Sequence, residues 1–504
     1  MQAPRQGQLV HGELVHSPLV WWARTRPAHC ALSDGQRSLT FAQLHAEVVQ
    51  RAHALEQALS PHSLFIDEQQ TQLEQLLQFL GIVASGRCAA VGDPDWPPSQ
   101  REAATDFLAA HNRRVIAGSA QPDSLFYIGF TSGSTGQPKG FCRDHYSWVS
   151  SFRACLQAFG NDASLPLIVP GHISHSLFLF GMLLGLWTGA GVVLQERFSA
   201  PAVWGHLTNV HTQDHSLVAV PAQLLVMLEY AERRALPALP TVKLVMISGA
   251  RWPRQHTDAL QALFPAAQII EFYGASELSF VAWTRSHISL PALVVGHPFD
   301  GVQIEIRPLP GNAMGGMPDA ENDPDSDQAI SPGLIWVRSP MLFRQYIGPA
   351  GEPENADSSA CLRDADGWLS VQDVGYLDAM GRLCLLGRLN RMIVTQARKL
   401  FPEELEMLLE SHPQIARASV HAINDALRGS LVCAVVNCNL DEPGQRPTAA
   451  SLAQWCRARL QAYKVPRQWW ICNDWSWTTS GKTDHAALAR MLRQKDSPCL
   501  QALR

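Results

Sequence analysis

Short apolar runs alternate with apolar helical patterns through most of the chain. Residues 61–95 place an apolar helix (LEQLLQFLGIVASG) between two short strands (SLFID and CAAVGD). The same β-α-β rhythm continues over residues 165–195, 205–230, 241–250 and 268–274, and it is typical of a parallel sheet covered by helices. Such sheets place their ligands at the carboxyl ends of the strands. The pattern therefore predicts an α/β body with a binding site along that edge.

The pattern over residues 19–55 predicts elements with a structural role. It indicates a helix, a short strand pair that turns at Asp34 and Gly35, and a second helix. Thr40 is placed to cap the start of the second helix, and Gln43, three residues later, completes the sequence pattern of a capping box.

Residues 177–194 (LFLFGMLLGLWTGAGVVL) are uncharged over 18 positions, which is the lower limit for crossing a bilayer. Four glycines interrupt this run, and Gly-Ala-Gly followed by Val-Val-Leu is typical of a helix that ends and a strand that begins. We therefore expect a buried helix, a turn and a strand, and no transmembrane segment. Peripheral contact with a membrane stays open.

From Gly296 onward the pattern favours antiparallel strands, such as VQIEIRPL and GLIWVRS. An acidic stretch rich in Gly and Pro, residues 308–332, is expected to be an exposed loop between two strands. After Arg388 the pattern returns to mixed helices and strands, including a helix with Pro402 in its first turn. This last part predicts a separate small domain of about a hundred residues.

The stretch 124–140 (SLFYIGFTSGSTGQPKG) carries the most specific chemistry in the chain. A buried strand runs into a loop of small, hydroxylated residues that closes on Lys139. Its glycines permit backbone conformations closed to other residues, and its hydroxyls, amides and lysine suit phosphate oxygens. A flexible linker is the alternative, but linkers seldom follow a strand directly or end in Pro-Lys-Gly. The spacing differs from a Walker A loop, because Gly140 follows Lys139 where a hydroxyl would be required.

Composition narrows the function class. The chain has 504 residues, 46% of them apolar, and 40 basic against 45 acidic side chains give a formal net charge of -5. No long basic run is present, so nucleic acid is not the expected partner, and a small-molecule enzyme with two or more domains fits better. The 11 cysteines contain no C-x-x-C pair, and the N-terminus lacks the pattern of a secretory signal. A cytoplasmic location is therefore the simplest expectation.

Six stretches occur together in a fixed order: TSGSTGQPKG (131–140), EFYGASE (271–277), GLIWVRSPMLFRQY (333–346), GWLSVQDVGYLDAMGRLCLLGRLNRMIV (367–394), KLFPEELE (399–406) and TTSGKTDHAAL (478–488). Together they resemble the adenylate-forming superfamily of acyl-CoA synthetases, peptide-synthetase adenylation domains and luciferases. The resemblance extends from LTFAQL (39–44) to the end of the chain.

The resemblance implies a fold and a reaction. The expected fold is α/β: a large N-terminal domain of α/β subdomains with a small β-barrel-like part (1–389), followed by a small mobile α+β domain (390–504). A carboxylate attacks the α-phosphate of ATP, with Mg²⁺, to give an acyl-adenylate and pyrophosphate, and a thiol then displaces AMP. Such a reaction between anions depends on charge neutralisation and positioning.

The resemblance also implies roles for single residues. Glu277 matches the magnesium ligand, Arg388 the arginine near ribose and phosphate, and Lys482 the lysine that touches the carboxylate and the α-phosphate. Asp373 matches the aspartate that binds the ribose hydroxyls, although Val371 and Gln372 replace its usual Thr-Gly neighbours. The full nucleotide-binding set implied is Thr131, Ser132, Gly133, Ser134, Thr135, Gly136, Lys139, Tyr273, Gly274, Ala275, Ser276 and Asp373.

Two positions concern the second step, in which the thiol displaces AMP. Asn390 stands at the hinge position, and Asn tolerates the unusual backbone torsions that a hinge requires. Gln396 and Ala397 replace a Gly-Gly pair where the resemblance implies that a pantetheine arm passes close to the backbone. Since a methyl group at Ala397 narrows that route, the acceptor is either CoA or the phosphopantetheine of an acyl carrier protein.

The resemblance places His175 beside the acid, with His172 as a close rival; either histidine could instead have a purely structural role. Amino-acid-activating relatives carry an aspartate at position 175, so an amino acid substrate is disfavoured. The implied acid pocket is His175, Ser176, Phe178, Ser248, Gly249, Ala250, Phe272, Tyr273 and Gly274, a lining that favours an apolar or aromatic carboxylic acid.

The leading hypothesis is thus an AMP-forming acid–thiol ligase that uses ATP, Mg²⁺ and most simply CoA. An acyl-AMP ligase that loads a carrier protein, a non-catalytic homologue that keeps the fold, and a luciferase-like oxygenase are the alternatives. Retention of Lys139, Glu277, Asp373, Arg388 and Lys482 argues against the non-catalytic homologue, and nothing in the sequence selects the oxygenase.

Overall fold

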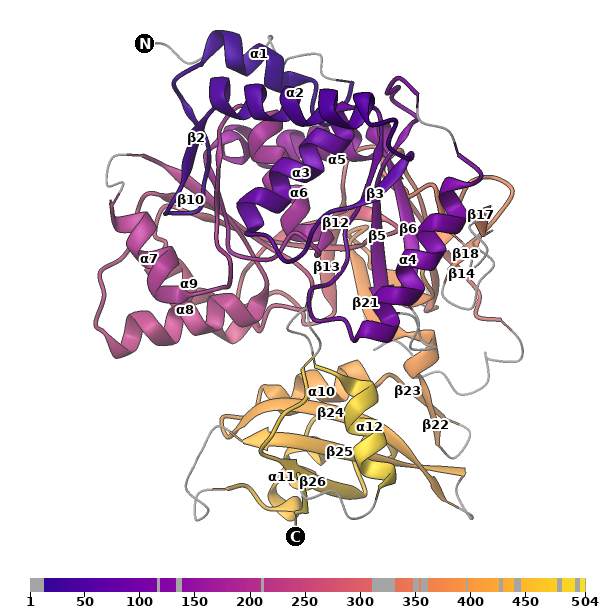
Figure 1. The fold of residues 1–504 in the computed structure, drawn as a ribbon. Helices are drawn as coiled ribbons and strands as arrows, with labels where there is room; N and C mark the ends of the chain where they lie inside the picture. The colour runs from indigo at the N-terminus through magenta and orange to yellow at the C-terminus, as the bar shows by residue number, and fades with distance from the viewer. Residues whose placement is uncertain are drawn as a thin grey trace. The chain divides into compact units, whose positions relative to one another are not determined.

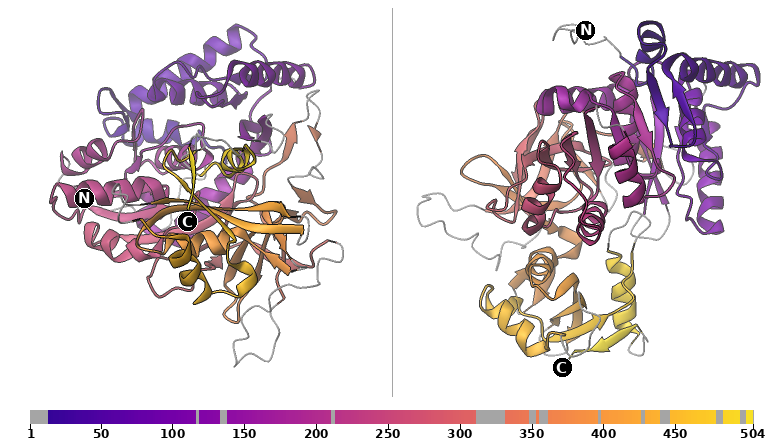
Figure 2. Two further views of the ribbon diagram at one scale, coloured as in Figure 1. Left: turned by 90° about the horizontal axis from the view of Figure 1, so that it is seen from below. Right: turned by 90° about the vertical axis from the view of Figure 1, so that its left-hand side faces the viewer.

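The computed structural model describes residues 13–115, 118–132, 138–209, 213–310, 331–347, 353–354, 361–395, 398–425, 429–438, 446–477, 483–494 and 499–503. The chain divides into two compact units, which are described separately. The first comprises Met1–Leu290, Gly296–Gln303 and Val337–Val371, and the second comprises Pro291–Val295, Ile304–Trp336 and Gln372–Arg504. Figures 1 and 2 show the elements of both units.

The first unit contains the predicted parallel sheet. Neighbouring strands pair in the order β2 (Ser38–Thr40), β1 (Cys30–Ser33), β8 (Val192–Leu194), β7 (Leu167–Val169), β9 (His215–Ala219), β10 (Val242–Ile247), β11 (Gln268–Ala275) and β12 (Ser279–Arg285). The pairs from β1 to β11 are parallel, whereas β2 and β12 are antiparallel to their neighbours. The antiparallel style therefore begins at β12, earlier than the predicted start near Gly296, and β12 pairs in turn with β13 (Val294–Pro298) through Trp283 and His297.

A second sheet of the first unit carries the phosphate-loop motif. Its order is β17 (Pro353–Glu354), β16 (Gln345–Ile347), β6 (Pro138–Asp144), β5 (Leu125–Ser132), β4 (Cys88–Ala90) and β3 (Ser63–Phe65). The strands β3, β4 and β5 run parallel. The β-α-β pattern of residues 61–95 predicted this for β3 and β4. The antiparallel partners β6 and β16 join segments some two hundred residues apart, a register that no local pattern specifies. Three further strands of this unit, β18 (Leu362–Arg363), β19 (Leu369–Ser370) and the end of β15 (Gly333–Arg338), pair antiparallel.

The helices of the first unit are α1 (Pro18–Thr25), α2 (Phe41–Gln57), α3 (Gln72–Ala84), α4 (Pro98–Asn112), α5 (His145–Phe159), α6 (Ser176–Trp187), α7 (Ala200–Asn209), α8 (Pro221–Arg233) and α9 (Thr257–Leu263). The predicted capping box of α2 is confirmed: Gln43 N donates to Thr40 Oγ1 (3.3 Å) and Thr40 N to Gln43 Oε1 (2.9 Å). Helices α7, α8 and α9 pack together on one face of the parallel sheet (Figure 1).

The apolar stretch 177–194 forms a buried helix, a turn and a strand, as predicted. Helix α6 is buried along nearly its whole length, and the chain turns into β8 through Gly189 (φ 72°) and Gly191 (φ 93°). A side chain at Gly191 would meet the Cys30 carbonyl, so this close approach requires glycine. None of the helices in the described ranges combines the length and the hydropathy needed to cross a membrane.

The second unit begins with an antiparallel layer. The strands β14 (Gln303–Arg307), the start of β15, β20 (Asp373–Leu377) and β21 (Leu383–Arg388) pair in that order. The predicted acidic loop falls largely on residues 311–330, outside the described part of the chain. A short 3-10 turn, η3 (Leu389–Arg391), then leads to the hairpin of β22 (Ile393–Thr395) and β23 (Arg398–Leu400).

The C-terminal residues fold around their own core, as predicted. The sheet consists of β24 (Ile415–Asp425), β25 (Gly429–Cys438), β26 (Gln468–Cys472) and β27 (Leu500–Ala502), with helices α10 (Pro402–Glu410), α11 (Ala449–Arg457) and α12 (His485–Arg493). Because side chains alternate along a strand, the buried residues of β25 divide between two faces of the sheet. Ala434 and Val436 pack with α10 and α11, whereas Val435 packs with α12. Figure 2 shows this sheet with its helices.

Candidate active site

The strand and lysine of the phosphate-loop motif form a hairpin. Strands β5 and β6 are antiparallel, with Thr131 opposite Lys139. The predicted ligands Gly133, Ser134, Thr135 and Gly136 lie outside the described residues. Lys139 is half-buried, with Nζ 5.8 Å from the centre of the Tyr346 ring. A Cβ at Gly140 would lie 2.8 Å from the Phe107 ring, so a larger residue there would require that ring to move.

Glu277 follows the carboxyl end of β11, in the turn to β12, where an α/β sheet places its ligands. Its side chain is buried (9% exposed). Tyr346 Oη donates to Glu277 Oε1 (2.7 Å), and Phe343 N donates to the Glu277 carbonyl (2.8 Å). Among the described residues, Glu277 Oε2 accepts no hydrogen bond. A buried carboxylate with one oxygen fixed and the other available is suited to a hard cation.

Arg143 hydrogen-bonds to the backbone of the turn that carries Glu277. The side chain is 1% exposed and donates to the carbonyls of Ser276 (Nη1, 3.0 Å) and Met341 (Nη2, 2.9 Å). Burial lowers the pKa of the Arg143 guanidinium to about 10, while the nearby charges of Asp144 and Glu277 oppose the shift. The group therefore stays cationic at neutral pH and ties β6 to the turn that carries Glu277.

Three hydroxyls connect the predicted nucleotide and acid residues. Ser176 Oγ lies 3.4 Å from Ser276 Oγ and 3.4 Å from Tyr127 Oη, which joins the start of α6, the turn after β11 and the strand β5. Tyr127 is fully buried, and burial raises the pKa of its phenol to about 12. The structure thus brings Ser176 and Ser276 together through a neutral polar contact, while their roles toward the acid and the nucleotide stay predictions.

The remaining predicted acid residues come from three neighbouring segments. His175 precedes α6 and Phe178 lies in its first turn, with a ring that occupies the space over Gly171. Ser248, Gly249 and Ala250 follow β10, and Ser248 Oγ donates to the Phe272 carbonyl of β11 (2.9 Å).

The rival histidine, His172, lies close to His175. His172 Nδ1 contacts Ser174 Oγ (2.9 Å), and burial, with the neighbouring His175, lowers the His172 pKa to about 4. His172 is therefore a neutral, internally bonded side chain. The choice of His175 over His172 stays a prediction.

Asp373 and Arg388 face each other in the second unit. They are directly paired residues at the ends of β20 and β21, and Arg388 Nε lies 3.3 Å from Asp373 Oδ1. Asp373 is buried, while the Arg388 side chain is largely exposed. The residue before Asp373, Gln372, has a left-handed backbone (φ 63°), and its carbonyl accepts from Leu389 N (3.0 Å).

The predicted hinge residue lies in η3, between two anchored neighbours. Before Asn390, the backbone is held by the Leu389–Gln372 bond. After it, Arg391 forms a bidentate pair with Glu406 of α10 (2.6 and 3.1 Å) and a further bond to Glu403 (3.0 Å). These contacts do not test a change of backbone torsion, so the hinge role of Asn390 stays a prediction.

Lys482 lies outside the described residues, as do Gln396 and Ala397. The residues on either side of the 478–482 segment are held together: Trp477 and Thr483 form an antiparallel bridge, and Asp484 N donates to the Ser476 carbonyl (2.9 Å). Asp484 also caps α12 by accepting from Ala487 N (2.8 Å).

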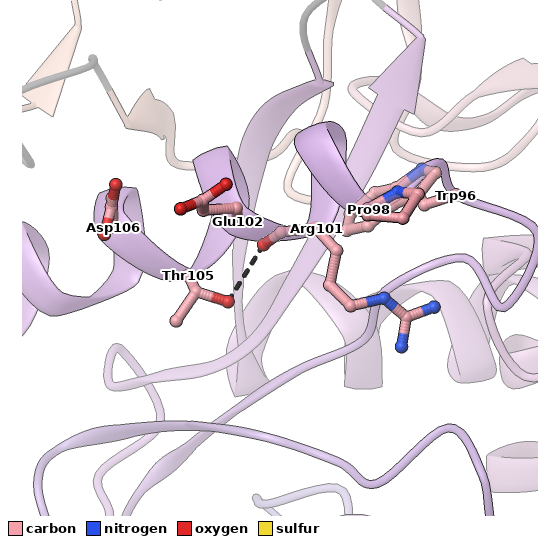
Figure 3. A pocket seen from close by; sticks show the side chains of 6 residues that line it. All are labelled: Trp96, Pro98, Arg101, Glu102, Thr105 and Asp106. Atoms are coloured by element: carbon pink, nitrogen blue, oxygen red, sulfur yellow. Dashed lines mark hydrogen bonds between the residues drawn. The ribbon is translucent and has the colours of Figure 1, made fainter.

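A separate surface depression of about 500 Å³ lies along α4 (Figure 3). Trp96 contacts the ring of Phe130 edge-on, with the two ring centroids 5.1 Å apart. Phe130 directly precedes Thr131 in the sequence. The six lining residues, none of which was a predicted site residue, are Trp96, Pro98, Arg101, Glu102, Thr105 and Asp106.

Sequence reasoning missed two residues that the structure connects to Glu277. Tyr346 lies in the quoted stretch 333–346 but was given no role, and Arg143 was not singled out. The available signal for Arg143 was a charged residue only a few positions after an apolar strand and its loop. For Tyr346, nothing local indicates that its hydroxyl reaches a residue 69 positions earlier.

These features define a class of protein: an α/β protein with a hairpin that ends on Lys139 and a buried acidic turn at the carboxyl end of a sheet strand. Comparison with known families agrees. The family described as AMP-binding enzyme matches residues 60–347, and the AMP-binding enzyme C-terminal domain matches residues 404–482. The chain therefore belongs to the AMP-binding enzyme family, and it is an AMP-forming, acyl-CoA ligase-like enzyme.

Two relatives illustrate the likeness in sequence. The chain is 29% identical over 504 residues to the uncharacterized acyl-CoA ligase YhfT of Bacillus subtilis (strain 168), covering 94% of this chain and 97% of the relative. It is 24% identical over 510 residues to 2-succinylbenzoate–CoA ligase of Geobacillus sp. (strain WCH70), covering 94% and 97%.

Among solved structures, the O-succinylbenzoate coenzyme A synthetase MenE of Bacillus subtilis in complex with ATP and magnesium ion matches with a TM-score of 0.75 and 20% identity, over 94% of this chain and 98% of that one. This likeness concerns the fold. It agrees with the mixed α/β body and the small C-terminal α+β domain expected from the sequence.

Proposed function

We propose that the chain activates an apolar or aromatic carboxylic acid as an acyl-adenylate and then transfers the acyl group to the thiol of CoA. A carboxylate oxygen forms a bond to the α-phosphorus of ATP as pyrophosphate leaves. The thiol sulfur then bonds to the acyl carbonyl carbon, and AMP leaves.

The single observation that carries this proposal is the setting of Glu277. A buried carboxylate at the carboxyl end of β11, bonded through one oxygen to Tyr346, fits a magnesium ligand. Within the described residues no group of three or more His, Cys, Asp or Glu side chains is arranged to hold a metal by itself. Glu277 would therefore share Mg²⁺ with the phosphates of ATP, and the bound ion would neutralise phosphate charge.

The other nucleotide roles follow from the family motifs. Lys139 and the loop from Thr131 to Gly136 would hold the β- and γ-phosphates, and the segment Tyr273–Ser276 would line the nucleotide. Asp373 offers a carboxylate for the two ribose hydroxyls, with Arg388 beside it. Lys482 would supply the positive charge at the reacting carboxylate and the α-phosphate.

The acid would lie among the segments that carry Ser176, Ser248 and Phe272. Phe178 and Phe272 supply apolar surface, and the Ser176–Ser276 contact joins this region to the nucleotide residues. This lining supports an apolar or aromatic acid, and a relative named for 2-succinylbenzoate is consistent with an aromatic one.

The phosphopantetheine of a carrier protein is the second candidate acceptor. The observation that favours it is Ala397 at a position where the family commonly has glycine. A methyl group there would crowd a pantetheine arm. CoA stays the first choice because the relatives named above are CoA ligases.

Product analysis tests the proposal. Purified protein is incubated with ATP, Mg²⁺ and a panel of aliphatic and aromatic acids, in parallel with CoA and with holo carrier protein, and products are identified by mass spectrometry. The proposal predicts acyl-CoA and AMP with at least one apolar or aromatic acid. Acylation of the carrier protein alone would select the second candidate, and formation of ADP in place of AMP would contradict both.

A further inference from the structure

Tyr346 contacts the two charged residues that the proposed function assigns to Mg²⁺ and phosphate. Its hydroxyl donates to Glu277 Oε1 (2.7 Å), and the Lys139 ammonium lies 5.8 Å from the centre of its ring. The side chain is 2% exposed, and the Phe343 ring packs against it edge-on (4.8 Å). One buried side chain thus donates to a carboxylate with its polar end and lies within cation–π range of an ammonium group with its aromatic face.

The backbone of Tyr346 is fixed by the same hairpin that carries Lys139. Strand β16 pairs with β6, with Tyr346 opposite Phe141 and Ile347 opposite Gly140. Three residues earlier, Phe343 N donates to the Glu277 carbonyl (2.8 Å). The segment 343–347 therefore connects the phosphate hairpin to the Glu277 turn by backbone bonds, and Tyr346 adds a side-chain connection between the same two elements.

We propose that Tyr346 is a positioning residue that couples Lys139 to Glu277 and orients the Glu277 carboxylate toward Mg²⁺ bound with ATP. This inference rests on the proposed function and extends it to a residue with no assigned role.

The chemistry of the contact supports this role. A phenol that donates to Oε1 restricts rotation of the carboxylate, so that Oε2 is the oxygen left for the ion. Hydrogen bonds to a charged group are stronger than neutral ones. The face of an aromatic ring also attracts an ammonium group, so the ring limits where Lys139 lies before phosphate arrives. Tyr346 thereby constrains both charged groups from a single buried side chain.

Calorimetry of ATP binding, with saturating Mg²⁺ and with EDTA, tests the inference without any acid substrate. Tyr346→Phe keeps the ring and removes the hydroxyl, so it should weaken Mg²⁺–ATP binding about tenfold and leave metal-free ATP binding unchanged. Tyr346→Leu also removes the ring and should in addition weaken metal-free ATP binding by about threefold.

A double-mutant comparison separates positioning from general packing. If Tyr346 acts through Glu277, adding Tyr346→Phe to Glu277→Gln should change Mg²⁺–ATP binding by less than about twofold further, by analogy with coupled pairs. The matched control is Tyr463→Phe, which removes a tyrosine hydroxyl that donates to the Lys399 carbonyl (3.3 Å), and it should leave both affinities unchanged.

Equal losses with and without Mg²⁺ in Tyr346→Phe, additive losses in the double mutant, or wild-type affinity in Tyr346→Phe would each overturn the inference. These outcomes are distinct from failure of the proposed function, which would appear as a wild-type protein that binds Mg²⁺–ATP but produces no AMP with any acid. A wild-type protein that binds no Mg²⁺–ATP would overturn both.

Discussion

Gln372 is a single residue at which this chain departs from the family pattern, and the structure shows its backbone conformation. Its backbone is left-handed (φ 63°), a region where a side chain is strained and glycine is not. The sequence motif already placed Gln372 where the family usually has glycine. The structure explains the preference: the left-handed residue directs its carbonyl to Leu389 N (3.0 Å) next to Asp373.

Gln372→Gly should therefore be more stable than Gln372→Ala by about 1 kcal/mol, since both lose the side chain beyond Cβ but only alanine keeps the strained Cβ. Urea unfolding of the two variants measures the difference directly. Equal free energies of unfolding would contradict the prediction, because the strain at this position would then be no larger than the extra backbone entropy that glycine loses on folding.

Among contacts between secondary-structure elements, those of Arg143 connect three segments of the chain. From β6 it reaches the carbonyls of Ser276, after β11, and Met341, before β16. Removing the guanidinium would take this donor from the buried Met341 carbonyl and the partly buried Ser276 carbonyl. Such a group costs about 1–3 kcal/mol when left unsatisfied.

Arg143→Leu should lower the free energy of unfolding by about 3 kcal/mol and weaken ATP binding, because the Glu277 turn loses its support. Arg153→Leu, which replaces an exposed arginine on α5, is the control and should stay within about 0.5 kcal/mol of wild type. If the two variants are equally stable, the Arg143 bonds do not hold the turn.

The sequence was most informative about elements whose signal is local. The Thr40–Gln43 capping box, the α6–β8 turn at Gly189 and Gly191, and the strand of the phosphate loop all follow from nearby residues. It was silent on α4 and α5. It also gave no indication of the β6–β16 pairing, because a register between distant strands depends on packing of the whole sheet.

The candidate site shows the same division. Ordered motifs named Lys139, Glu277, Asp373 and Arg388 from the sequence alone. Motifs did not show that Arg388 pairs with Asp373, or that Tyr346 and Arg143 surround Glu277. A hydrogen bond between side chains 69 residues apart cannot be predicted from the spacing of residues in a motif.

For the molecule as a whole, its buried histidines predict that the free energy of unfolding decreases in acid. Burial lowers the pKa of His16 and His62 to about 4, and of His145, beside His16, to about 3. Their ordinary value is 6.5. Between these values the unfolded chain binds more protons than the folded one, so the free energy of unfolding falls as the pH falls.

Urea unfolding should therefore show decreasing stability from about pH 6.5 to pH 5, with the decline continuing toward about pH 4 as the buried histidines are forced to protonate. The window above about pH 5 largely avoids the titration of ordinary carboxylates. A constant free energy of unfolding across that window would contradict this explanation.

Acid activation through an adenylate is the central step of the proposed function, and exchange of labelled pyrophosphate into ATP measures that step with no acceptor present. With Mg²⁺ and a panel of aliphatic and aromatic acids, the wild-type protein should catalyse acid-dependent exchange, and Lys482→Ala should lose most of it. Exchange that is absent with every acid, or that proceeds equally well without acid, would contradict the central claim.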